Sequence, residues 1–180
     1  NTAYAQLMLD VGPKNVADLA TQMGITSPLK AVPALTLGTS EVSVLDMASG
    51  YSTLADNGEH IKPTVVTKVT DAKGNVLFEA SPQKAGDPNL RALDARTAFV
   101  MDSLLQEVTK SGTAASARPA LGRSDIAGKT GTTNDNADAW FIGFTPQLLG
   151  GTWIGADDRF IRLESGLGYG GQAARPIWAA

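Results

Sequence analysis

Four consecutive residues in the last third of the sequence combine one cation with two hydroxyl groups. Lys129, Thr130, Gly131 and Thr132 follow residues 124–128, which the sequence predicts to be extended. Side chains on a strand point alternately to opposite faces, so the two threonine hydroxyls are expected to point the same way. Gly131 between them lets a ligand or another backbone come close. The spacing therefore predicts a strand edge that holds an anion or a peptide.

Three interpretations of the Gly-Lys-Thr sequence compete. The first is a phosphate-binding loop, but Gly122 and Gly128 enclose one residue more than that motif allows, and residues 131–136 are a poor start for the helix it requires. The second is the K-T-G box of penicillin-binding proteins and serine β-lactamases. The third is an ordinary threonine-rich strand with Lys129 on its solvent face. The rest of the chain has to decide between them.

The composition is that of one globular domain, with 180 residues, of which 43% are hydrophobic and 18% charged. The formal charge of −3 shows no basic excess, so nucleic acid is not expected as a partner. Cysteine is absent, which excludes disulfides and thiolate metal sites. The single histidine, His60, follows a predicted helix and is expected to be an exposed bystander. Asp138 and the pair Asp157-Asp158 resemble a carboxylate cluster, but no third ligand pattern supports a metal site. No stretch predicts a membrane span.

Helices are predicted over most of the first 110 residues. Apolar spacing and capping residues place them at 1–10, 13–24, 39–57 and 94–110. Thr39 or Ser40 is the expected cap of the third helix and Asp94 that of the fourth. A hairpin is predicted within residues 64–80. The side chains expected to be buried are Tyr4, Leu7 and Met8, then Val42, Leu45, Ala48 and Leu54, and then Phe99, Val100, Leu104, Leu105 and Val108.

Strands are predicted in the last third of the chain. They cover residues 124–132, 139–145 and 149–156, with short connections that suit antiparallel neighbours. Residues 113–123 are small and are predicted to form a flexible loop, and a final helix is predicted from 173 to 180. Trp140, Phe141, Trp153 and Trp178 are interpreted as packing residues. This order of elements predicts an α+β fold for residues 1–180, with no linker or repeat.

Several segments together resemble the transpeptidase domain of class A penicillin-binding proteins. The resemblance follows their order over nearly the whole chain and is far more specific than K-T-G alone. It implies the serine β-lactamase/transpeptidase-like fold, here its later half, and the tail is similar to the actinobacterial form. The segments are residues 37–42, 47–58, 61–63, 129–134 and 138–144, and Gly170-Gly171 through Pro176-Ile177-Trp178.

The family carries the motifs S-x-x-K, S-x-N and K-T-G in that order. The chain starts Asn1-Thr2-Ala3-Tyr4, so Asn1 resembles the last residue of S-x-N, and the nucleophilic serine is expected upstream of it. Residues 27–30 and 81–84 also match S-x-x-K. Each has proline directly after serine in a loop-like setting, whereas the chemistry needs serine and lysine one helical turn apart. We therefore expect an N-terminal segment carrying S-x-x-K as the partner of this chain.

The resemblance implies a D,D-transpeptidase of peptidoglycan. In that reaction a serine attacks the D-Ala-D-Ala peptide bond of a stem peptide, and an amine of a second stem resolves the acyl-enzyme. A β-lactam mimics the D-Ala-D-Ala and leaves a stable ester. The alternatives are a D,D-carboxypeptidase or β-lactamase-type hydrolase and a non-catalytic β-lactam receptor. The implied location is the extracytoplasmic face of the bacterial cell membrane, with the anchor outside this chain.

The resemblance also implies roles for individual residues. Lys129 supplies positive charge near the substrate carboxylate, and Thr130 and Thr132 donate hydroxyl hydrogen bonds to that carboxylate. The backbone N–H of Thr132 is half of the oxyanion hole. Gly131 permits the close approach of the substrate. The remaining implied contacts are Asn1 with the acyl amide and Asn134 in the same groove, and no cofactor or metal is implied.

Overall fold

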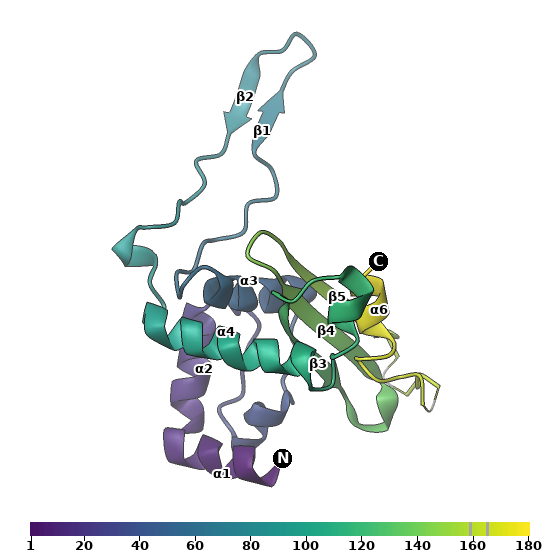
Figure 1. The fold of residues 1–180 in the computed structure, drawn as a ribbon. Helices are drawn as coiled ribbons and strands as arrows, with labels where there is room; N and C mark the ends of the chain where they lie inside the picture. Colours follow the sequence, from purple (N-terminus) through teal and green to yellow (C-terminus); the bar gives the residue numbers. More distant parts are fainter. Residues whose placement is uncertain (159, 165) are drawn as a thin grey trace.

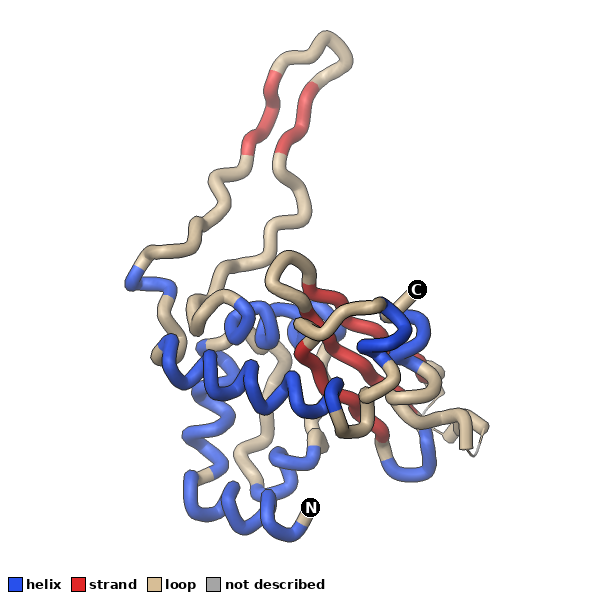
Figure 2. The backbone as a smooth tube through the Cα atoms, viewed as in Figure 1, coloured by secondary structure: helices blue, strands red, loops and turns tan. Residues whose placement is uncertain are grey.

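The computed structural model describes residues 1–158, 160–164 and 166–180. Helices and one three-stranded antiparallel sheet form the body of the molecule, and a long hairpin projects away from it (Figures 1 and 2). The α-helices are α1 (Thr2–Val11), α2 (Pro13–Gln22), α3 (Val44–Ala55), α4 (Ala95–Lys110), α5 (Ala117–Leu121) and α6 (Ala174–Trp178). The strands are β1 (Lys68–Thr70), β2 (Val76–Glu79), β3 (Ala127–Thr132), β4 (Asp138–Phe144) and β5 (Leu149–Gly155), and the short 3₁₀ helices are η1 (Pro33–Leu37), η2 (Pro88–Leu90) and η3 (Asn134–Asn136).

Helices cover both faces of the sheet, whose strand order is β3-β4-β5. Gly150 and Gly151 are neighbours on β5 and therefore face opposite sides. A side chain at Gly151 would meet Val44 of α3 at 3.1 Å, and one at Gly150 would meet the indole of Trp178 in α6 at 2.8 Å. The same indole N–H lies 3.1 Å from the carbonyl oxygen of Gly150. Thus α3 lies on one face of the sheet and α6 on the other.

The core is divided by the sheet in the same way. On the α3 side, Leu54 and Leu105 pack with Ala127 and Phe144, and on the α6 side Phe141 packs with small residues. Phe141 is fully buried, and its ring lies 5.0 Å from that of Trp178 in an edge-to-face arrangement. The α+β architecture expected from the sequence is confirmed, and Asp94 caps α4 by accepting a hydrogen bond from the amide of Arg96.

The third helix begins later than expected. Ser43, and not Thr39 or Ser40, is its cap, because the Ser43 hydroxyl accepts a hydrogen bond from the amide of Asp46 at 3.0 Å. The predicted buried face was wrong in part: Leu54 is buried as expected, whereas Leu45 is 57% exposed. The cause is Asp46, which accepts hydrogen bonds from both Thr26 and Ser27 and so turns its own side of the helix inward. The buried residues of α3 are Asp46, Ser49, Gly50, Thr53 and Leu54.

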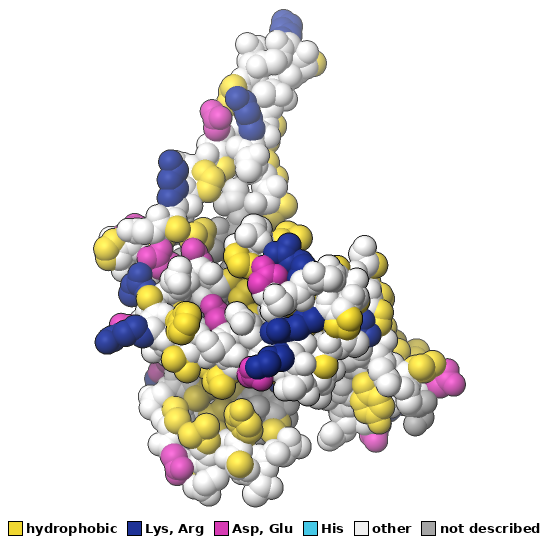
Figure 3. Space-filling model, in the orientation of Figure 1, with side chains coloured by type: hydrophobic (Ala, Val, Ile, Leu, Met, Phe, Trp, Pro, Cys, Tyr) yellow, Lys and Arg dark blue, Asp and Glu magenta, His cyan; other side chains and the backbone are white. Residues whose placement is uncertain are grey.

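Large apolar side chains of α1 and α4 are exposed, in contrast to the sequence prediction. Tyr4 and Leu7 are 65% and 53% exposed, and Phe99 is 70% exposed. The side of α4 that faces the sheet is the one that carries Leu105 and Thr109, since Leu105 packs with Ala127 of β3 and Thr109 donates a hydrogen bond to the carbonyl oxygen of Ile126. Apolar side chains gather over the region of α1, α2 and α4 on the face shown in Figure 3. The buried residues of α4 are Ala98, Leu105 and Thr109, and the other exposed ones are Val100 and Leu104.

Two further segments differ from the prediction. Residues 113–123, expected to be a flexible loop, contain the short helix α5. The hairpin has shorter strands than expected, with Lys68 paired to Glu79 and Val69 to Phe78. All residues of both strands are exposed, because the hairpin extends away from the body and packs on neither face of the sheet (Figure 1).

Candidate functional site

The K-T-G residues lie on β3 at the edge of the sheet. The amide of Thr133 donates to the carbonyl oxygen of Asp138 at 3.1 Å, so the odd-numbered residues of β3 direct their backbone groups toward β4. By the alternation of a strand, the N–H of Thr132 and the C=O of Thr130 point away from β4. No other strand pairs with this edge within the part of the chain that the structure describes. The edge is therefore open to an extended ligand.

Helix α4 closes only the beginning of this edge. The hydroxyl of Thr109, a fully buried residue of α4, donates to the carbonyl oxygen of Ile126 at 2.5 Å. Gly128 is still buried, whereas Lys129 and Thr132 are exposed and Thr130 is half-buried. The accessible part of the edge therefore coincides with the Lys-Thr-Gly-Thr sequence.

Lys129 approaches the edge from the α3 side of the sheet. Its cross-strand partner is Ile142, whose side chain faces the same side as Val44 of α3. The Lys129 ammonium donates a hydrogen bond to the carbonyl oxygen of Thr130 at 2.9 Å. Partial desolvation of the side chain lowers the pKa of Lys129. The cation is thus placed at the open edge, in surroundings that favour loss of its proton.

Thr130 and Thr132 have the common orientation that the sequence predicted, on the opposite face from Lys129. Thr130 is the cross-strand partner of Phe141, which faces α6. The hydroxyl oxygens of Thr130 and Thr113 lie 2.7 Å apart. The amide of Gly170 donates to the hydroxyl oxygen of Thr132 at 3.1 Å. Lys129 and the two threonines can therefore bind the same ligand only if that ligand lies along the edge of β3, where groups from both faces of the sheet can contact it.

The turn that follows the K-T-G strand is held by side chains. The Thr133 hydroxyl accepts from the Asp138 amide at 2.7 Å and donates to the Asp138 carboxylate at 3.2 Å. The indole N–H of Trp153 donates to the same carboxylate at 2.9 Å. Trp153 therefore does more than pack, which the sequence did not predict. Asn134 is exposed in η3, and the two residues after it have positive φ angles, a conformation that Asp and Asn tolerate.

Asn1, the other predicted site residue, lies at the start of α1 (Figure 1). Its side chain is exposed and does not cap the helix, and among the described residues no hydrogen bond joins it to β3. The structure thus places Lys129, Thr130, Gly131 and Thr132 at one edge but, among the residues it describes, gives no hydrogen bond between them and Asn1. Ser27 and Ser81, the two matches to S-x-x-K, both lie outside helices.

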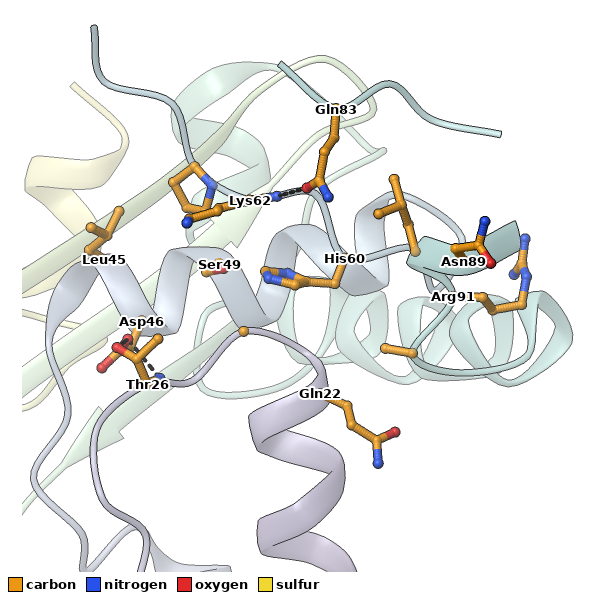
Figure 4. Close-up of a pocket in the computed structure, with 14 residues that line it drawn as sticks. Gln22, Thr26, Leu45, Asp46, Ser49, His60, Lys62, Gln83, Asn89 and Arg91 are labelled. Atoms are coloured by element: carbon orange, nitrogen blue, oxygen red, sulfur yellow. Dashed lines mark hydrogen bonds between the residues drawn. The ribbon is translucent and has the colours of Figure 1, made fainter. Parts of the chain in front are cut away.

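A separate cavity of about 710 Å³ lies beside α3, and no residue of β3 lines it (Figure 4). His60 projects toward Ser49 in this cavity, and its Nδ1 lies 3.4 Å from the hydroxyl oxygen of Thr53. The expectation that His60 is exposed was wrong, because the ring is half-buried against α3. Other lining residues are Gln22, Thr26, Lys62, Gln83 and Arg91.

The residues that the structure describes contain no cluster of histidine and acidic side chains suited to a metal ion. In the same residues, none of the helices combines the length and the apolar character that crossing a membrane requires.

Comparison with known sequences matches nearly the whole chain to one family. A family model described as the penicillin binding protein transpeptidase domain matches residues 1–177. Penicillin-binding protein 1A of Neisseria flavescens is 37% identical over 179 residues. The aligned region is 99% of this chain but only 22% of that protein, so this chain spans a minor part of the length of its relative.

Solved structures show the same fold. Penicillin-binding protein 1A from Haemophilus influenzae superposes with a TM-score of 0.89 at 27% identity, covering 99% of this chain and 31% of the other. The PonA1 protein from Mycobacterium tuberculosis, solved in complex with penicillin V, superposes with a TM-score of 0.81 at 30% identity. That match covers 99% of this chain and 52% of the other.

Proposed function

Because this chain belongs to the family of penicillin-binding protein transpeptidase domains, we propose that it forms part of a D,D-transpeptidase. The enzyme cross-links peptidoglycan stem peptides through a serine acyl-enzyme and is a target of β-lactams. The observation that carries this proposal is the position of Lys-Thr-Gly at the edge of β3 with which no other described strand pairs, within a chain that matches the family over residues 1–177. An extended stem peptide, or a β-lactam in its place, lies along that edge as an additional strand.

In this proposal the edge stabilises the charge that develops on the substrate. The outward N–H of Thr132 donates to the oxygen of the attacked carbonyl, where one such donor is worth about 3–4 kcal/mol of the barrier. The Lys129 ammonium lies beside this point and supplies positive charge. A lowered pKa lets Lys129 take part in proton transfer as well as in electrostatic attraction. Gly131 leaves the Lys129 face of the edge free of a side chain at a position where a Cβ would meet Trp140 at 3.0 Å.

The substrate carboxylate is held by the hydroxyls of Thr130 and Thr132. Hydrogen bonds to a charged acceptor are stronger than those between neutral groups, which favours a carboxylate over an ester or amide at this position. Asn134 lies in the exposed turn after β3 and lines the same groove. Asn1 contributes its amide to the acyl side of the substrate in the complete domain.

The nucleophilic serine comes from an N-terminal segment that carries S-x-x-K. The apolar side chains of α1 and α4 that remain exposed here pack against that segment, since exposed apolar surface favours association. Tyr4, Leu7, Phe99 and Leu104 are the main residues of this surface. The complete enzyme acts at the extracytoplasmic face of the bacterial membrane, where its substrate is found.

The experiment uses the complete transpeptidase domain with its upstream segment. The domain is incubated with a stem-peptide donor ending in D-Ala-D-Ala, with and without an amine acceptor, and with fluorescent penicillin. A transpeptidase gives a cross-linked product that depends on the acceptor. Hydrolysis alone would make the protein a D,D-carboxypeptidase, and acylation by penicillin without turnover of the donor would make it a receptor. Absence of any acylation would overturn the proposal.

A further inference from the structure

Three segments that are distant in the sequence meet behind the K-T-G strand. They are the loop that carries Thr113, the strand that carries Thr130 and Thr132, and the glycine pair Gly170-Gly171. A side chain at Gly171 would meet the carbonyl oxygen of Thr113 at 2.6 Å and the methyl group of Thr130 at 3.7 Å. A side chain at Gly170 would clash with the backbone carbonyls of Gly131 and Trp140. The absence of side chains at both glycines thus lets the three segments make direct contact.

The contact between these three segments determines the direction in which the Thr132 hydroxyl can donate its proton. A hydroxyl group has one proton to donate and two lone pairs that accept. The amide of Gly170 can only donate, so Thr132 is the acceptor in the 3.1 Å hydrogen bond between them. The proton of the Thr132 hydroxyl is therefore free to be donated to a ligand. An amide donor also makes that hydroxyl a better donor, because hydrogen bonds in a chain polarise one another.

Thr113 stands in the same relation to Thr130. Their hydroxyl oxygens are 2.7 Å apart, and either one can be the donor in the free protein. When Thr130 donates its proton to an anion, the hydrogen bond between the two threonines remains only if Thr113 donates. Thr113 comes from the loop between α4 and α5, so a segment outside the strand supplies this hydroxyl. Thr130 and Thr132 would then each accept a hydrogen bond, from Thr113 and from the Gly170 amide, and donate their own hydroxyl proton toward the open edge.

We propose that Thr113 is a positioning residue for the anion site. It directs the Thr130 hydroxyl toward the substrate carboxylate, as the Gly170 amide does for Thr132. This inference rests on the proposed function, because it assumes that Thr130 binds the carboxylate of a stem peptide or a β-lactam. Thr113 acts through Thr130 and need not touch the substrate itself.

The test measures acylation rates of the complete transpeptidase domain. Thr113→Val removes the hydroxyl at nearly constant shape, and Thr113→Ser retains it. The two probes are benzylpenicillin, which has the carboxylate, and its methyl ester, which does not. Thr67→Val, an exposed threonine before β1, serves as the matched control. Thr113→Val should slow acylation by benzylpenicillin about fivefold, as the loss of one hydrogen bond predicts, and leave the ester rate nearly unchanged. Thr113→Ser should restore the rate.

A double-mutant cycle separates a role through Thr130 from an independent one. In the Thr130→Val background, Thr113→Val should have almost no further effect on acylation by benzylpenicillin. Additive losses, equal losses with both probes, or no loss in the single variant would each overturn the inference. Failure of the unmodified domain to react with benzylpenicillin would instead contradict the proposed function, so the two failures can be told apart.

Discussion

The ammonium nitrogen of Lys129 lies 2.9 Å from the carbonyl oxygen of Thr130, the next residue on the same strand. Adjacent side chains on a strand leave it on opposite faces, yet this contact brings the lysine to the edge where the Thr132 amide also points. The proposed site is thus a property of a strand edge. A cation, two hydroxyls and a backbone donor converge there because no neighbouring strand among the described residues occupies the position.

Lys129 should matter through its charge. Lys129→Ala should abolish most acylation by penicillin, whereas Lys129→Arg should lose only part, because a planar guanidinium keeps the charge but not the compact geometry. In the unmodified domain the acylation rate should decline at alkaline pH as Lys129 loses its proton. The decline should begin below the ordinary lysine pKa of 10.5, because desolvation lowers the pKa of Lys129. In Lys129→Arg this decline should move to higher pH. Equal acylation rates and equal pH profiles in the unmodified domain and both variants would show that Lys129 does not contribute to acylation.

Thr132→Val should slow acylation by penicillin by about tenfold or more, because a hydrogen bond to a charged group is lost and the shape is nearly unchanged. The backbone donor to the attacked carbonyl remains in this variant. Acylation by the penicillin methyl ester should therefore change much less. Thr67→Val is again the control. If both rates fall equally, the Thr132 side chain supports the fold and does not bind the carboxylate.

Asp138 should hold the turn that ends the K-T-G strand. Asp138→Ala leaves the Trp153 indole and the Thr133 hydroxyl without their acceptor, which should lower the free energy of unfolding by about 1–3 kcal/mol. Asp138→Asn keeps one acceptor oxygen and should lose less. Chemical denaturation of the complete domain measures both, with the exposed Asp157→Ala as control. Stability unaffected by Asp138→Ala would refute a structural role for this carboxylate.

Asp46 should make stability depend on pH in the acid range. Burial raises its pKa, but the hydrogen bonds from Ser27 and Thr26 outweigh burial and hold the pKa well below the ordinary value of 3.8. The folded state therefore binds this proton less tightly than the unfolded state. The contribution of Asp46 is fully present above pH 3.8 and is lost as the pH falls toward the pKa of the folded state.

Denaturation midpoints measured between neutral and acid pH test this prediction. Asp46→Asn should be less stable near neutral pH and should lose less on acidification than the unmodified domain, whereas Asp157→Asn should behave like the unmodified domain. An acid-range slope that is identical in Asp46→Asn and the unmodified domain would rule out this origin of the pH dependence.

Local signals in the sequence account for much of the fold. The alternation of a strand correctly placed Thr130 and Thr132 on one face, and Phe141 was correctly assigned to the core. Asp94 was found as a cap because capping depends on the residues next to it. These predictions required no knowledge of distant contacts.

The errors share a different origin. Leu45 was expected inside because helical spacing shows that a face exists, but the hydrogen bonds of Asp46 to Thr26 and Ser27 decide which face it is. Thr113 and Gly170 were missed because each reaches β3 from a separate loop. The signals in the sequence were a threonine next to Gly112 and the pair Gly170-Gly171, which belongs to the segments that resemble the family. Neither pattern specifies a partner.

We propose that the open edge of β3 binds both the carboxylate and the reacting carbonyl of the substrate. The most direct measurement is a crystal structure of the complete domain acylated by penicillin. The ligand carboxylate should lie within hydrogen-bonding distance of the Thr130 and Thr132 hydroxyls, and the acyl oxygen should accept a hydrogen bond from the amide of Thr132. A penicillin bound with its carboxylate and acyl oxygen away from these groups, or attached to Ser27 or Ser81, would contradict this proposal.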